Sequence, residues 1–127
     1  MPLELRPRVL LADNHVGILV ALQQLLEPTC DVVGRVTDGA ALLEVITKLK
    51  PDIVVLDISM PRIDGLEACR QIKHATPQTK VVILTAANDE DVRQHAYNVG
   101  ASAFVLKYAM AEELVTAIQK AFNGCQH

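Results

Sequence analysis

Short apolar runs alternate with longer amphipathic segments along the chain. The apolar runs, rich in Val, Ile and Leu, lie at residues 8–12, 31–36, 52–57, 80–85 and 103–106. Runs of this length indicate buried strands. Between them, apolar residues recur at helical spacing, which predicts helices at residues 15–26, 39–49, 65–75, 90–99 and 111–122. The alternation predicts an α/β protein of five βα units, with a parallel sheet covered by helices on both faces.

The composition fits one small domain with an aliphatic core. The chain has 127 residues without a linker or repeat, so one domain is expected. Half of the residues are hydrophobic, yet there are only two Phe, two Tyr and no Trp. A net charge of −3 offers no basic surface for nucleic acid, so we do not expect this domain to bind DNA directly.

The cysteines and the apolar segments indicate the cellular compartment of the protein. Cys30, Cys69 and Cys125 are far apart and lack the CxxC spacing of a metal or redox site. We therefore expect reduced thiols in a cytoplasmic protein. The N-terminal residues lack the apolar core of a signal peptide, and no apolar run is long enough to span a bilayer. No membrane partner is expected.

Four of the predicted strands end at a residue whose side chain can bind a ligand or react: Asp13, Asp57, Thr85 and Lys107. In an open parallel sheet the carboxyl ends of the strands lie at one edge, where ligands bind, so these side chains can converge. Carboxylates suit Mg²⁺, which is usually held by one or two of them. A lysine and a hydroxyl can bind phosphoryl oxygens, and an aspartate can act as a nucleophile that forms an acyl phosphate. The set predicts phosphoryl transfer.

Other phosphate-binding classes fit the sequence poorly. Neither GxxxxGK[ST] nor GxGxxG follows the first predicted strand, which argues against a P-loop or dinucleotide-binding protein. A phosphatase of the haloacid dehalogenase type needs a second aspartate where Ser59 stands. A flavin module would need flanking aromatics, which are scarce here.

Five motifs together resemble a known family. They are LLADNH at residues 10–15, VVLDISMP at 54–61, DGLE at 64–67, VILTA at 82–86 and GASAFVLK at 100–107. In this order they resemble the receiver domain of bacterial two-component response regulators, over residues 8–124. The ADxH start and the LKxxxxxEL ending are most similar to the NarL/LuxR-type branch. The resemblance implies a flavodoxin-like, doubly wound fold of strand order 2-1-3-4-5, with one receiver domain in residues 1–127 and its output domain outside this chain.

The resemblance also implies roles for the residues at the strand ends. Asp57 would accept a phosphoryl group from a sensor histidine kinase or from acetyl phosphate. Asp13, Asp57 and the backbone carbonyl of Ser59 would hold Mg²⁺, and Lys107 would contact the phosphoryl group. The domain would phosphorylate and dephosphorylate itself as a phosphoacceptor and would not be a turnover enzyme.

A switch and an output follow from the same resemblance. Thr85 would move toward the phosphoryl group and let Phe104 swing inward, which would rearrange the surface of the fourth helix, fifth strand and fifth helix. The expected output is transcription through a helix-turn-helix domain beyond His127. Homodimerisation is a possible consequence, and DNA would be reached only through that output domain.

Asn14 departs from the family pattern. Receivers usually carry a second acid at this position, where it serves as a metal ligand. The loss of one anionic group predicts weaker Mg²⁺ binding and slower phosphorylation, or in the alternative a phosphorylation-independent protein-interaction module. Asn14 is also a favoured residue type for the N-cap of the first helix, and the two interpretations are compatible.

The first predicted helix has a wide apolar surface. Val16, Leu19 and Val20 extend it beyond the spacing that a core face requires. The sequence leaves two interpretations open, a wide buried face or a contact with a kinase or second copy. His15, just after the candidate site, is expected to be a surface residue of the first turn rather than a catalytic base.

Overall fold

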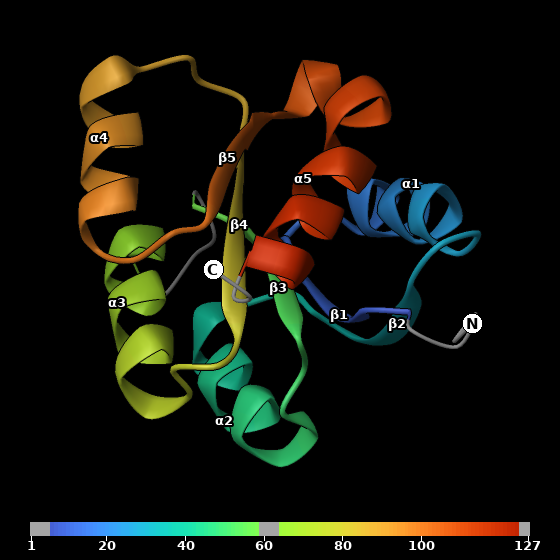
Figure 1. Cartoon of the computed structure of the whole chain (residues 1–127), viewed down its shortest axis with the longest axis horizontal. Coiled ribbons are helices and arrows are strands. Elements are labelled where there is room, and N and C mark those ends of the chain that lie inside the picture. The colour runs from blue at the N-terminus through green and yellow to red at the C-terminus, as the bar shows by residue number, and fades with distance from the viewer. Residues whose placement is uncertain (1–5, 59–63, 125–127) are drawn as a thin grey trace.

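Five parallel strands form the central sheet of the computed structural model, which describes residues 6–58 and 64–124. They are β1 (Arg8–Ala12), β2 (Asp31–Val36), β3 (Ile53–Asp57), β4 (Lys80–Thr85) and β5 (Ala103–Leu106). Their order in the sheet is β2-β1-β3-β4-β5 (Figure 1). The flavodoxin-like fold and the strand order implied by the resemblance are confirmed.

Five α-helices connect and follow the strands. They are α1 (Val16–Leu26), α2 (Gly39–Leu49), α3 (Gly65–Ala75), α4 (Glu90–Asn98) and α5 (Met110–Gly124), with a short 3-10 helix at Lys107–Ala109 before α5. The predicted helices are confirmed, with small differences at their ends. Asp38, Asp64 and Asp89 cap α2, α3 and α4 by accepting backbone N–H groups of the first turn. These caps explain why the three helices begin where the pattern predicts.

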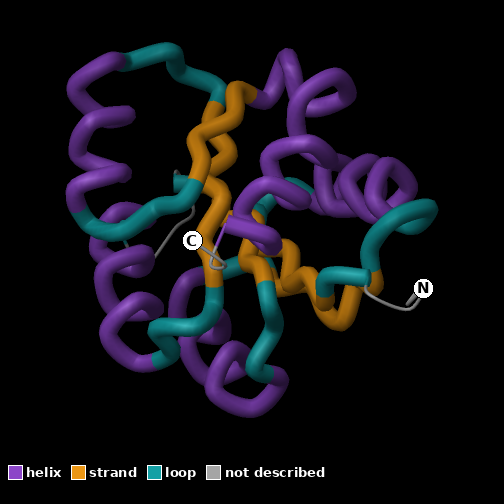
Figure 2. The backbone as a smooth tube through the Cα atoms, in the orientation of Figure 1, coloured by secondary structure: helices purple, strands orange, loops and turns teal. Residues whose placement is uncertain are grey.

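Two aliphatic cores lie on opposite faces of the sheet, because successive side chains of each strand point to opposite sides. In β1, for example, Val9 and Leu11 join the core under α1 and α5, whereas Leu10 joins the core under α2, α3 and α4. The two groups of helices are seen on either side of the strands (Figure 1, Figure 2). Burial on both faces accounts for the continuous apolar runs in the sequence.

The start of α1 corrects one detail of the sequence analysis and decides another that it left open. The N-cap residue is His15 and not Asn14, because the carboxylate of Asp13 accepts the backbone N–H of His15 at 2.8 Å and the helix begins one residue later. Asn14 is exposed. Leu19 is buried in the core, so it belongs to the packed face, whereas Val16 and Val20 are 65% and 41% exposed. The solvent-facing apolar surface of α1 is therefore limited to these valines.

Gly65 brings α3 into close contact with the end of β3. A Cβ atom added at Gly65 would lie 2.3 Å from the Cα of Ile58, the residue after Asp57. The absence of a side chain at this position thus allows the close packing of α3 against the end of β3. Val99 is the C-cap of α4, and Gly100, the next residue, has φ of +109°, a left-handed conformation that favours glycine.

Cys30 and Cys69 are free and buried, and Cys125 lies outside the described residues. Burial raises the pKa of both thiols, that of Cys69 to about 11, which favours unreactive, reduced thiols. Within residues 6–58 and 64–124, no helix has both the length and the apolar character needed to cross a membrane.

Candidate phosphoryl-transfer site

The register of the sheet aligns the ends of the functional strands. Ala12 of β1 pairs with Leu56 of β3, so Asp13 and Asp57 follow at adjacent positions. On the other side, Asp57 pairs with Leu84, and Thr85 is the next residue of β4. Thr85 in turn pairs with Leu106, which directly precedes the fourth residue of the set, Lys107. The expected convergence at one edge of the sheet is thus present in the structure.

Lys107 bridges the two aspartates. Its Nζ lies 3.0 Å from Oδ2 of Asp13 and 3.4 Å from Oδ2 of Asp57. Both aspartate side chains are fully buried, and the lysine side chain is 16% exposed. Two buried carboxylates so close together require positive charge nearby. The ammonium group supplies one such charge.

Asp13 shows that this edge of the sheet can accommodate a cation. Its Oδ1 accepts the backbone N–H of His15, but no described residue donates a hydrogen bond to its buried Oδ2, which meets Lys107 only as an ion pair. A buried oxygen with an incomplete set of donors is costly. A bound cation would satisfy it, and carboxylate oxygens are suitable ligands for Mg²⁺. The residues therefore fit the ion that the sequence predicts.

His15 also reaches the site, which the sequence analysis did not anticipate. Its Nδ1 lies 3.1 Å from Oδ1 of Asp13, although its side chain is 60% exposed. One ligand atom each from Asp13, His15 and Asp57 falls within a group no wider than 4.8 Å. The two-residue spacing of Asp13 and His15 was the only sign in the sequence that their side chains could meet. Whether they do meet depends on where α1 begins.

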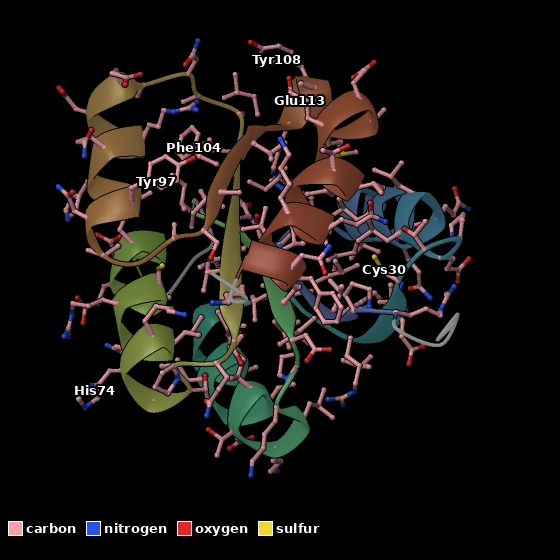
Figure 3. All side chains as sticks on the ribbon, viewed as in Figure 1. Cys30, His74, Tyr97, Phe104, Tyr108 and Glu113 are labelled. Carbon is pink, nitrogen blue, oxygen red and sulfur yellow. The ribbon has the colours of Figure 1, made fainter. Side chains whose placement is uncertain are left out.

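The proposed switch residues lie along β4 and β5. Thr85 is buried, and its Oγ1 accepts the backbone N–H of Ala87 at 3.2 Å. Phe104 is buried between the sheet and α4, and the Arg93 guanidinium lies 5.5 Å from the centroid of its ring. Figure 3 shows Phe104 and Tyr97 between α4 and β5. The ring of Phe104 is thus already buried in this structure.

Ser59, whose backbone carbonyl is a predicted metal ligand, lies outside the described residues. Asn14 is exposed beside the site, at the position where the family usually carries an acidic metal ligand. The site that the structure describes consists of the aspartate pair, Lys107 and Thr85, with His15 at its entrance.

Comparison with known proteins identifies the family. The family model of the response regulator receiver domain matches residues 9–119. The transcriptional regulatory protein LiaR of Bacillus subtilis (strain 168) is 34% identical over 119 residues, which cover 92% of this chain and 56% of LiaR. The chain spans about half the length of the curated relatives that it matches.

Solved structures agree with this comparison. A LuxR-family two-component response regulator from Aurantimonas sp. SI85-9A1 aligns with a TM-score of 0.89 and 30% identity, covering 94% of this chain and 86% of that one. The signal receiver domain designated NarL from Mycobacterium tuberculosis aligns with a TM-score of 0.88 and 30% identity, over 94% and 98% of the two chains. The chain therefore belongs to the receiver domains of two-component response regulators, in their NarL/LuxR-type branch.

Proposed function

We propose that Asp57 accepts a phosphoryl group from a sensor histidine kinase or from acetyl phosphate. The observation that carries this proposal is the buried pair of Asp13 and Asp57 bridged by Lys107. An oxygen of Asp57 attacks phosphorus, and the bond from phosphorus to the kinase imidazole nitrogen or to acetate oxygen breaks. The product is an acyl phosphate on Asp57, with imidazole or acetate as the leaving group.

Different groups around Asp57 would neutralise different negative charges during the transfer. Asp13, Asp57 and the carbonyl of Ser59 would hold the cation, which neutralises charge on the transferring group when bound. Lys107 stays within reach of Asp57 and would pair with a phosphoryl oxygen. Loss of the phosphoryl group to water would return the domain to its starting state. We infer a self-modifying phosphoacceptor, and not an enzyme that turns over an external substrate.

The proposed output follows from Thr85 and Phe104. The Oγ1 atom of Thr85 accepts the backbone N–H of Ala87, and its O–H would donate to a phosphoryl oxygen on Asp57. Movement of Thr85 would change the space beside Phe104 and bias the surface formed by α4, β5 and α5. Since LiaR is a transcriptional regulatory protein longer than this chain, we propose that this surface controls transcription through an additional DNA-binding domain.

A protein partner is supported by the exposed end of α1. Val16 and Val20 present apolar side chains to solvent, and Val16 directly follows His15 at the entrance to the site. A kinase domain that delivers a phosphohistidine to Asp57 must cover this entrance. We propose that these valines contribute to that contact, or to a homodimer that uses the same face.

Beryllofluoride with Mg²⁺, which mimics a bound phosphoryl group, tests the proposal. Amide resonances of the wild-type domain should shift along β4, β5 and α4, and Asp57→Asn should abolish the response. Asp31→Asn, which makes the same change at an exposed position of β2, should respond like the wild type. If wild type and Asp57→Asn respond identically, the domain is a phosphorylation-independent interaction module and the proposal fails.

Asn14→Asp should strengthen Mg²⁺ binding. It adds a carboxylate beside the site, and we expect the Mg²⁺ dissociation constant to fall about tenfold or more, since a third carboxylate, beside those of Asp13 and Asp57, increases the attraction for the cation. Calorimetric titration measures this change. Asn123→Asp, which adds the same charge at the exposed end of α5, is the control. Equal Mg²⁺ affinities for Asn14→Asp and wild type would show that Asn14 does not limit the site.

A further inference from the structure

The Arg93 side chain contacts two aromatic rings. Its guanidinium carbon lies 5.5 Å from the centroid of the Phe104 ring and 5.9 Å from that of Tyr97. Both distances are within the range in which a ring face attracts a cation. Arg93 and Tyr97 stand one turn apart on α4, whereas Phe104 belongs to β5, as Figure 3 shows for the two rings. The guanidinium group therefore joins the helix to the edge strand of the sheet.

The two rings are the main partners of this guanidinium group. Within residues 6–58 and 64–124, no carboxylate forms a salt bridge with Arg93 and no group accepts a hydrogen bond from its side chain. The residue is only partly exposed. Because a cation–π attraction grows stronger as the cation loses water, the contact with the rings is favoured at this half-buried position.

Close packing alone does not fix the ring of Phe104. The ring is buried, with 6% exposure, but it borders a surface cavity of about 580 Å³ that Tyr97 and side chains of α5 also line. On that side the ring has room to turn. A side chain with free space beside it can populate a second rotamer unless a specific contact favours the first. The Arg93 guanidinium group supplies such a contact.

Phe104 lies on the same face of the sheet as Thr85. Thr85 pairs with Leu106, which is two residues beyond Phe104, and Ile83, two residues before Thr85, packs with Phe104 in one core cluster. Side chains two positions apart on a strand point to the same face. The hydroxyl that would follow a phosphoryl group and the ring held by Arg93 are therefore neighbours on the face that α4 covers.

We propose that Arg93 is a positioning residue of the switch, which holds the ring of Phe104 in its buried position before any phosphoryl group is added. Phosphorylation of Asp57 then stabilises a ring position that is already populated. Without Arg93, more of the free domain has the ring turned outward, and the buried position depends more strongly on phosphorylation. The inference rests on the switch of the proposed function, but the contact itself is a property of the free domain.

NMR of protein labelled in its phenylalanine rings tests this inference without any phosphoryl analogue. The chain has two phenylalanines, Phe104 and Phe122, and Phe104→Leu assigns their signals. A soluble gadolinium chelate relaxes exposed ring protons. In Arg93→Met, the ratio of outward to buried Phe104 rings should rise about fivefold, the factor expected from a cation–π contact of ordinary strength. Relaxation of the Phe104 ring should rise with it, while that of Phe122 stays unchanged.

Two further variants show whether the charge is responsible. Arg93→Lys keeps a cation and should reverse at least about half of the change seen in Arg93→Met. Methionine and lysine are both good helix formers, so both variants should keep α4. Arg35→Met is the matched control, because Arg35 is exposed on β2, at the opposite edge of the sheet from β5. It should leave the relaxation of the Phe104 ring as in the wild type.

The outcomes separate this inference from the proposed function. Equal relaxation of the Phe104 ring in Arg93→Met and wild type would overturn the role of Arg93, even if beryllofluoride still acts through Asp57. A ring as exposed in Arg93→Lys as in Arg93→Met would also contradict it, because the positive charge would then not hold the ring. A more exposed ring in Arg93→Met alone would support the role of Arg93, even if the domain did not respond to beryllofluoride.

Discussion

Replacing Gly65 with alanine is expected to destabilise the domain by about 3 kcal/mol, at the upper end of the range for overpacking. The added methyl group would lie 2.3 Å from the Cα of Ile58 and 2.8 Å from its carbonyl oxygen. Backbone atoms cannot rotate away as the end of a side chain can, so α3 or the segment after β3 must shift. The usual gain of alanine over glycine in a helix, about 1 kcal/mol or less, is too small to offset this cost.

The same substitution should impair the site. Ile58 directly follows Asp57, and a displacement of about 1 Å at a reacting group can slow a reaction roughly 100-fold. Urea unfolding measures the stability, and mass spectrometry after incubation with acetyl phosphate measures the modification. Gly17→Ala is the matched control in α1, where nothing lies within 4 Å of the added carbon, and it should stabilise the domain by about 0.5 kcal/mol. Equal stability of Gly65→Ala and wild type would contradict the contact.

Lys107→Met should be the most damaging change within the site itself. Methionine keeps much of the apolar stem but removes the only charge that the structure places within 3.4 Å of both aspartates, among the described residues. Removal of one partner from a buried ionic group costs about 3–5 kcal/mol, and the partial exposure of Lys107 points to the lower end. We expect a loss of about 3 kcal/mol and little modification by acetyl phosphate.

A divalent cation should restore part of that loss, because it can replace the missing charge between Asp13 and Asp57. Urea unfolding of Lys107→Met with and without MgCl₂ measures the recovery. Lys120→Met, an exposed change on α5, should alter stability by no more than about 0.5 kcal/mol. If Lys107→Met unfolds at the wild-type urea concentration, the ion pairs with the aspartates contribute little to folding.

The strands were predictable because burial on both faces leaves an unbroken aliphatic signal, as in residues 53–57. The order of the strands in the sheet could not be predicted from this pattern. Alternating strands and helices fix a parallel sheet but not the sequence of neighbours, which came only from the family motifs. The convergence of Asp13, Asp57 and Lys107 followed from topology, since parallel strands share one edge for their carboxyl ends.

What the sequence did not settle concerns rotations and contacts that a linear pattern does not specify. It left open whether Leu19 belongs to a wide buried face or to a contact surface, and the orientation of α1 on the sheet turns it inward and leaves Val16 outside. His15 is a surface residue as expected, but its approach to Asp13 depends on the backbone turn between them. The contact of Gly65 with Ile58 arises only once α3 packs against β3.

The bridge from Lys107 to Asp57 joins residues 50 positions apart, and this has a thermodynamic consequence. The unfolded chain cannot assemble such a site, so any cation that binds there binds the native state alone. Linkage then requires the cation to raise the free energy of unfolding, by about 2.7 kcal/mol at a concentration 100-fold above its dissociation constant. The fraction of the domain that is folded in a cell would therefore depend on the supply of that cation, apart from any signal carried by phosphorylation.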